Sequence, residues 1–218
     1  YKIAGPQVGV EKEILKKVCQ LIGYNKNSGG TLPTGGSMSN FMSLIMARDK
    51  VDSSIKDKGA NQKLIAYSSE NSHYSMSKNA SFVGIGKENV HYIQSNETGQ
   101  MDVECFKKQV EKDLANGLSP FYLNATAGTT VLCAFDNIAD LSPICKQYNI
   151  WLHLDGAFGG GVIFSTKHKH LVNGISQTNS FCFNAHKTLG APLSTSVLVV
   201  KNQKDLHNSF NYEAPYLY

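Results

Sequence analysis

Long apolar runs and proline are both scarce in this chain of 218 residues. The longest apolar runs, such as residues 196–200, fall far short of the roughly 18–20 residues needed to cross a bilayer. Only 6 prolines occur, and no stretch rich in Pro or Ser marks a linker. With 41% hydrophobic and 17% charged residues, the composition is that of a folded, soluble chain rather than a disordered or membrane-spanning one.

The chain also has only a small excess of charge of one sign. Lys and Arg exceed Asp and Glu by 21 − 17 = +4, spread along the chain, which is a poor argument for binding nucleic acid or a membrane surface. Five widely spaced cysteines include no C-x-x-C pair, so a disulfide framework or zinc site has little support. We therefore expect a reducing compartment, with the cytoplasm as the default.

The ends of the chain lack the usual marks of a complete protein. It begins at Tyr1 without a methionine and stops at Tyr218 directly after an aromatic-rich stretch. We expect a piece of a longer protein, whose missing start could hide a targeting segment.

Hydrophobic residues alternate between helical and strand periods along the chain. The patterns predict helices at 8–22, 39–48, 72–82, 103–115 (with Asp102 as its N-cap) and 138–148. They predict strands at 63–67, 90–93, 121–124, 150–154, 180–183 and 196–201. Strands that are apolar on both faces and separated by helices indicate a parallel sheet covered on both sides. We predict a single α/β domain.

Polar residues gather where the predicted strands end or a helix begins. They occupy the five segments 30–39, 68–73, 126–130, 155–161 and 184–187. Because ligands of such sheets bind where strands end and loops begin, we expect one shared site.

The glycine-rich segment GGTLPTGGSMS, residues 29–39, has the glycine spacing of a nucleotide-binding P-loop. Gly36 stands where the lysine of that motif belongs, and no preceding apolar strand is evident, so the nucleotide-binding interpretation fails. Small residues entering a helix N-terminus still suit a phosphate, because free backbone N–H groups are exposed there. A flexible connection with a serine helix cap stays open as the alternative.

Three further side chains could carry chemistry, and each has an ordinary alternative. Asp155 ends an apolar strand beside small residues, although a capping role is equally common. Lys187 lies just past another buried strand, where a desolvated lysine could form a Schiff base and a surface lysine is the alternative. His73 follows a strand, where capping or core histidines are more frequent. The run His168–His170 is interpreted as a solvated basic turn, so no metal site is predicted.

Taken together, a phosphate cradle, an aspartate, a lysine and a histidine are what pyridoxal 5'-phosphate needs from a protein. The segments NATAGTT (124–130), WLHLD (151–155) and NAHK (184–187) resemble the group II pyridoxal-phosphate-dependent amino acid decarboxylases. SENSHYS (69–75) and LVNGI (171–175) resemble glutamate and cysteine sulfinate decarboxylases more narrowly.

The resemblance runs from about Tyr1 to Tyr218. It implies the large domain of the pyridoxal-phosphate-dependent transferase fold of aspartate aminotransferase type I, with a mostly parallel sheet. Residues 1–218 would form this cofactor-binding domain, without the N-terminal segment, catalytic loop and small C-terminal domain of the family.

The resemblance also implies site roles. Lys187 would form the Schiff base with the cofactor, Asp155 would pair with the pyridinium nitrogen, and His73 would stack on the ring. The other implied cofactor contacts are Ala157 on the opposite ring face, Thr126 at its polar edge, and Ser37, Met38, Ser39, Asn184 and His186 around the phosphate. The family usually has Ala at position 156 and Pro at 185. Gly156 and Ala185 are therefore expected to loosen the local backbone without removing a functional side chain.

The implied activity is α-decarboxylation of an amino acid, most readily an acidic one such as glutamate, cysteine sulfinate or aspartate. The implied assembly is a homodimer with no nucleic acid or membrane partner. Two alternatives stay open: another pyridoxal-phosphate lyase such as a diaminobutyrate decarboxylase, and a non-catalytic cofactor-binding or dimerisation fragment.

Overall fold

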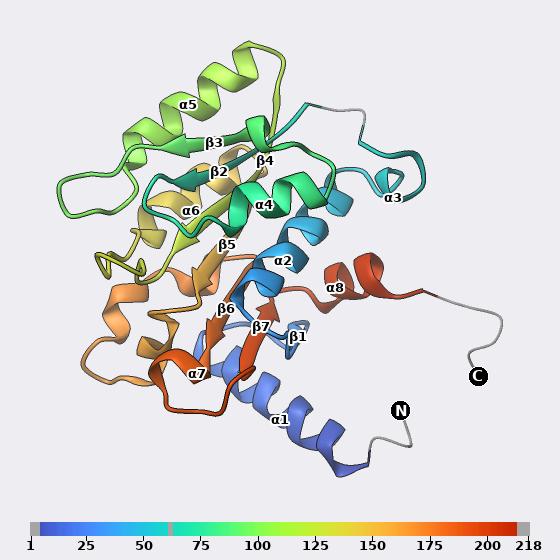
Figure 1. Ribbon diagram of the computed structural model, residues 1–218, viewed down its shortest axis with the longest axis vertical. Coiled ribbons are helices and arrows are strands. Elements are labelled where there is room, and N and C mark those ends of the chain that lie inside the picture. Colours follow the sequence, from blue (N-terminus) through green and yellow to red (C-terminus); the bar gives the residue numbers. More distant parts are fainter. Residues whose placement is uncertain (1–4, 61–62, 213–218) are drawn as a thin grey trace.

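The fold is a mixed sheet of seven strands between two helical layers (Figure 1). The computed structural model describes residues 5–60 and 63–212, so the outermost residues of the predicted 1–218 domain lie outside the described part. The strands are β1 (Gly29–Thr31), β2 (Leu64–Ser69), β3 (Val90–Ile93), β4 (Ser119–Thr126), β5 (Trp151–Gly156), β6 (Ser180–Asn184) and β7 (Ser196–Val200). The α-helices are α1 (Pro6–Leu21), α2 (Gly36–Val51), α3 (Ile55–Lys58), α4 (Ser75–Phe82), α5 (Val103–Ala115), α6 (Ile138–Gln147), α7 (Ala185–Thr188) and α8 (Gln203–Phe210).

Strand order in the sheet is β1-β7-β6-β5-β4-β2-β3, and neighbours from β6 to β3 run parallel. The predicted mostly parallel α/β sheet is confirmed. One strand departs from the expectation of parallel pairing, because β7 is antiparallel to both β6 and β1. The link from β6 to β7 holds only the four-residue helix α7, and an antiparallel neighbour needs no long crossover.

Two cores form on opposite faces of the sheet, because neighbouring residues of each buried strand point to opposite faces. Ile65 and Tyr67 of β2 pack on the face covered by α1, α5 and α6. Leu64 and Ala66 pack on the face covered by α2 and α4. The strands are apolar along their whole length because both of their faces are buried.

Two local predictions need correction. The first three residues of the glycine-rich segment form the strand β1, which was not predicted, because three half-buried residues at a sheet edge carry no apolar pattern. Helix α2 begins at Gly36 rather than at residue 39, with Gly35 as its N-cap and no side-chain cap hydrogen bond. In contrast, α5 has the predicted bounds, and Asp102 accepts a hydrogen bond from the Cys105 N–H as its N-cap.

Candidate cofactor site

A cavity of about 370 Å³ lies where β4, β5 and β6 end and α2 begins. Eight of the ten predicted cofactor contacts line it: Ser37, Met38, His73, Thr126, Asp155, Ala157, Asn184 and Lys187. These side chains come from segments that are far apart in the sequence and meet at one edge of the sheet. Thr34, Gly36, Thr129 and Thr130, which belong to the predicted segments 30–39 and 126–130, also line this cavity. Asn40, which the sequence did not single out, lines it as well.

The other two predicted contacts, Ser39 and His186, do not line the cavity. Ser39 is buried, and both its N–H and its hydroxyl donate to the Gly35 carbonyl, at 3.0 and 3.2 Å. The His186 ring lies 3.1 Å from the Thr195 carbonyl through Nδ1. Both side chains therefore stabilise the loops that border the cavity.

Asp155 ends β5 and is 4% exposed, with hydrogen bonds to both carboxylate oxygens. Oδ2 accepts from Nδ2 of Asn40 at 2.7 Å, and Oδ1 accepts from the Ala157 N–H at 2.9 Å. The Cys182 thiol lies 3.8 Å from Oδ1, and burial raises the pKa of that thiol, which keeps it a neutral donor. Among the described residues no cationic group pairs with this carboxylate at salt-bridge distance. A buried carboxylate with hydrogen-bond donors but no counter-ion suits a cationic ligand atom.

Lys187 lies on α7, just past β6, and its side chain is exposed while lining the cavity. Of the two interpretations left open for Lys187, an exposed lysine describes this structure, because α7 extends beyond the end of the sheet. The amine is thereby accessible from the cavity.

His73 is half-buried, and its Nδ1 accepts a hydrogen bond from the Ser75 N–H at 3.2 Å. Burial lowers the pKa of His73 below its ordinary value of 6.5; nearby Asp155 opposes that change and Lys187 adds to it. The neutral ring therefore carries its proton on Nε2 and can present a flat face to a ligand.

The two departures from the family pattern have structural explanations. A Cβ on Gly156 would lie 2.7 Å from the Phe181 ring and 2.8 Å from the Cys182 carbonyl, so the packing around this position favours glycine. The Ala185 N–H donates to the Thr195 carbonyl at 2.9 Å, a bond that proline could not make.

Asp136 is a buried carboxylate that the sequence did not single out. It accepts from the backbone N–H groups of Met101 and Thr126, each at 2.7 Å, and so fixes the end of β4 at the cavity. Burial raises the pKa of Asp136 to about 6, while the two N–H donors oppose that change. The sequence did not predict a role for Asp136, because that role depends on contacts with Met101 and Thr126 that form only in the folded chain.

The N-terminus of α2, an exposed lysine and a buried aspartate around one cavity are the features of a pyridoxal-phosphate site at the edge of an α/β sheet. The sequence matches the "Pyridoxal-dependent decarboxylase conserved domain" over residues 1–218. The chain belongs to this family of pyridoxal-dependent carboxy-lyases.

Solved structures agree with this membership. Mouse CSAD superposes with a TM-score of 0.95 and 35% identity, over 100% of this chain and 47% of that chain. A glutamate decarboxylase domain from Vibrio parahaemolyticus, named as part of a diaminobutyrate-pyruvate transaminase and L-2,4-diaminobutyrate decarboxylase, gives a TM-score of 0.89 and 29% identity over 93% and 46% of the two chains. Tryptophan decarboxylase of Catharanthus roseus gives 0.88 and 26%, over 98% and 47%. The chain thus spans about half the length of the solved proteins it matches.

Proposed function

We propose that the protein to which this chain belongs decarboxylates an amino acid at its α-carbon, with pyridoxal phosphate in this cavity attached to Lys187. The observation that carries the proposal is that Lys187 and Asp155, from the ends of adjacent strands, line the same cavity as the first turn of α2. A lysine and an acidic partner for the pyridine nitrogen are the two groups that this cofactor requires.

The residues of the cavity fit the cofactor. Among the described residues, Oγ1 of Thr126 and Oδ1 of Asn184 are buried without a hydrogen-bond partner, and both residues line the cavity. The first turn of α2 packs closely against Ala157 at Gly36, where a Cβ would lie 2.7 Å from the Ala157 Cβ, so only glycine fits there. The first N–H groups of α2, at Gly36, Ser37 and Met38, have no partner within the helix and favour a phosphate.

Each side chain then has a task. Asp155 would pair with the ring nitrogen, while His73 and Ala157 would contact the two ring faces. The cofactor, when bound, supplies an electron sink for the pair left as carbon dioxide departs. The Lys187 Nζ would hold the cofactor covalently and would hold a proton beside the reacting carbon.

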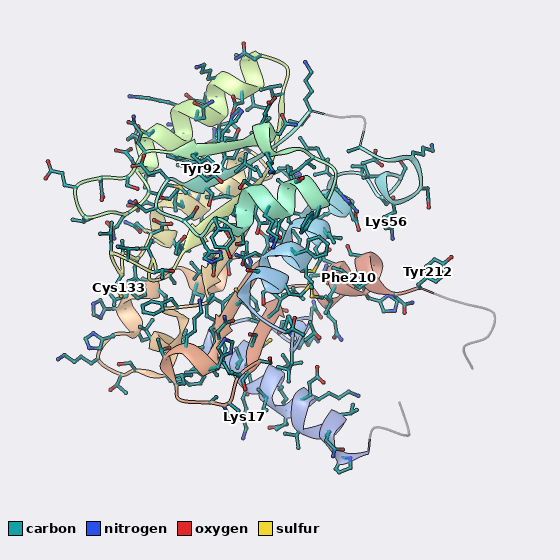
Figure 2. All side chains as sticks on the ribbon, viewed as in Figure 1. Lys17, Lys56, Tyr92, Cys133, Phe210 and Tyr212 are labelled. Carbon is teal, nitrogen blue, oxygen red and sulfur yellow. The ribbon has the colours of Figure 1, made fainter. Side chains whose placement is uncertain are left out.

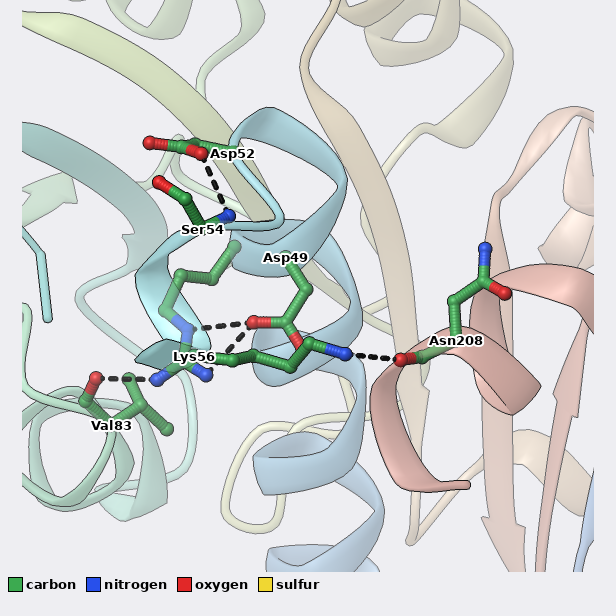
Figure 3. A network of polar contacts seen from close by, with 7 residues as sticks. Asp49, Asp52, Ser54, Lys56, Val83 and Asn208 are labelled. Atoms are coloured by element: carbon green, nitrogen blue, oxygen red, sulfur yellow. Dashed lines mark hydrogen bonds and ion pairs between the residues drawn. The ribbon is translucent and has the colours of Figure 1, made fainter. Parts of the chain in front are cut away.

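For the substrate we propose an acidic amino acid: glutamate, cysteine sulfinate or aspartate. The motifs at 69–75 and 171–175 and the 35% identity to mouse CSAD support this class. The single arginine of the chain, Arg48, lies at the opposite end of α2 and donates to Asp49 and to the Val83 carbonyl (Figure 3). Lys187 is the one lysine or arginine in the described lining of the cavity, so the side-chain carboxylate of an acidic substrate needs a cation from outside that lining.

We also propose a homodimer and a cytoplasmic location. Val131 and Leu132, which follow the cavity-lining Thr130, are 90% and 56% exposed, and adjacent exposed apolar side chains beside a site are typical of an interface. All five cysteines are free thiols, including the exposed Cys133 on the same loop (Figure 2), which suits a reducing compartment. No described helix is long and apolar enough to cross a membrane.

The test is an assay of the full-length protein with pyridoxal phosphate and a panel of amino acids, following carbon dioxide and amine products. We expect the wild type to release carbon dioxide from an acidic amino acid, and Lys187→Ala to do so at least a thousandfold more slowly. That loss of rate corresponds to an activation barrier about 4 kcal/mol higher. Release only from diaminobutyrate would favour that second candidate, supported by the Vibrio match. Cofactor binding without any product would favour a non-catalytic role.

A further inference from the structure

Beneath Asp155, four buried polar side chains form one unbroken series of hydrogen bonds. Trp151, Ser180, His153 and Asn40 are each at most 4% exposed and come from β5, β6 and α2. We call this series, which ends on Asp155, the buried relay.

Every link of the buried relay is short. Nε1 of Trp151 donates to the Ser180 hydroxyl at 2.9 Å, and that hydroxyl lies 2.7 Å from Nδ1 of His153. Nε2 of His153 lies 3.1 Å from Oδ1 of Asn40, whose Nδ2 donates to Oδ2 of Asp155 at 2.7 Å.

The two ends fix the direction of every bond between them. An indole N–H can only donate and a carboxylate can only accept. Asn40 donates from Nδ2 to the carboxylate, so its Oδ1 faces Nε2 of His153, which must carry the ring proton. Nδ1 of the neutral imidazole then accepts the single proton of the Ser180 hydroxyl, whose oxygen accepts from the indole. Burial lowers the pKa of His153 to about 4, with Asp155 opposing, so the ring is neutral near pH 7.

This direction matters most at Asn40. Rotating its amide by half a turn would place Oδ1 against the Asp155 carboxylate and two N–H groups against the N–H of His153, so both contacts would become repulsive. The relay thus selects one amide orientation, and with the Ala157 N–H it fixes both oxygens of Asp155.

We propose that Ser180, His153 and Asn40 are positioning residues that hold Asp155 in the orientation that binds the cofactor ring. The proposal rests on the proposed role of Asp155 as the partner of the ring nitrogen. It extends the site to side chains that do not touch the cofactor, two of which, His153 and Ser180, do not line the cavity.

The first test needs no cofactor. Nitrogen NMR of ¹⁵N-histidine-labelled protein, with His153 assigned by loss of its signals in His153→Phe, reports which ring nitrogen carries the proton. We expect a neutral ring protonated on Nε2 from pH 6 to 8 in the wild type, and a mixture of tautomers in Ser180→Ala. A proton on Nδ1, or a charged ring at pH 7, would overturn the proposal.

The second test measures the dissociation constant of pyridoxal phosphate by fluorescence titration. Ser180→Ala removes the hydroxyl partner of His153 and leaves Asn40 a less ordered donor to the Asp155 carboxylate, which predicts roughly tenfold weaker binding. Tyr24→Phe is the matched control, because it removes a buried hydroxyl that bonds Thr178 at 2.6 Å on the other face of the sheet. We expect comparable losses of unfolding free energy but unchanged affinity in this control. Equal affinities in Ser180→Ala and the wild type would refute the positioning role. If the wild type binds no cofactor, the proposed function fails, while the NMR result still decides whether the relay exists.

Discussion

Asn40 donates a 2.7 Å hydrogen bond from Nδ2 to Oδ2 of Asp155, joining α2 to the end of β5 across 115 positions of the sequence. Helix α2 also contributes the glycine-rich first turn at the other side of the cavity. One helix therefore sets the distance between the proposed phosphate cradle and the proposed partner of the ring nitrogen. This shared element explains how a rigid bifunctional cofactor could be held at both ends.

Thr126→Val tests whether the unpartnered hydroxyl of Thr126 awaits a ligand. Valine keeps the shape, so the cofactor-free protein should gain about 1 kcal/mol of unfolding free energy as an unsatisfied buried hydroxyl is lost. Cofactor affinity should fall roughly fivefold to tenfold, because the ligand loses a hydrogen-bond partner. Urea unfolding and cofactor titration measure the two effects.

Ser196→Ala is the control for that experiment, because the Ser196 hydroxyl is also buried without a partner in the described part of the chain but does not line the cavity. We expect a similar gain of stability with unchanged cofactor affinity. Equal affinities in both variants would show that Thr126 has no ligand contact.

Gly156→Ala should destabilise the fold, although alanine is the usual residue of the family at this position. The new methyl group would press on Phe181 and on the Cys182 carbonyl, and overpacking of this kind costs about 1–3 kcal/mol. Gly9→Ala, in helix α1 with open space around it, should instead gain up to about 1 kcal/mol. Chemical denaturation compares them, and a neutral Gly156→Ala would mean that the pocket around this residue relaxes freely.

Stability should fall in acid through His153. Because burial lowers its pKa to about 4 from an ordinary 6.5, the unfolded chain takes up a proton first, and stability present above pH 6.5 is lost as the pH falls toward 4. The loss reaches about 3 kcal/mol for this shift. Asp136, with its pKa raised to about 6, acts in the opposite direction, since the folded state binds the proton first between pH 6 and 4.

The difference between wild type and His153→Phe isolates the histidine, since Asp136 is common to both proteins. Urea unfolding at pH 7, 5.5 and 4 should show the stability advantage of the wild type shrinking by about 3 kcal/mol. A constant difference would mean that His153 titrates alike in the folded and unfolded chains.

Much of the fold was predictable because local rules and burial agree. Helix α5 has its predicted bounds since an apolar stripe and the Asp102 cap coincide, and the buried strands match their apolar runs. The three-residue strand β1 and the antiparallel direction of β7 were not predictable. Both depend on pairing between distant segments rather than on a pattern within one segment.

The candidate site was predictable where polar or small residues follow a strand or begin a helix, as Asp155 and Ser37 do. Asn40 was hidden among the residues of a helix, and its role depends on a contact with another element. His153 did leave a signal, because it lies two residues before Asp155 and so shares its face of a strand that is buried throughout. A polar residue at such a position needs a partner, which only the folded structure identifies.

The central claim, that Lys187 carries the cofactor, is tested most directly by chemical trapping. Protein loaded with pyridoxal phosphate is reduced with borohydride, which makes a Schiff base permanent, and is then digested for peptide mapping by mass spectrometry. The account predicts one modified residue, Lys187, in the peptide that follows β6, with loss of the label in Lys187→Ala. A label on another lysine, with Lys187 unmodified, would contradict it.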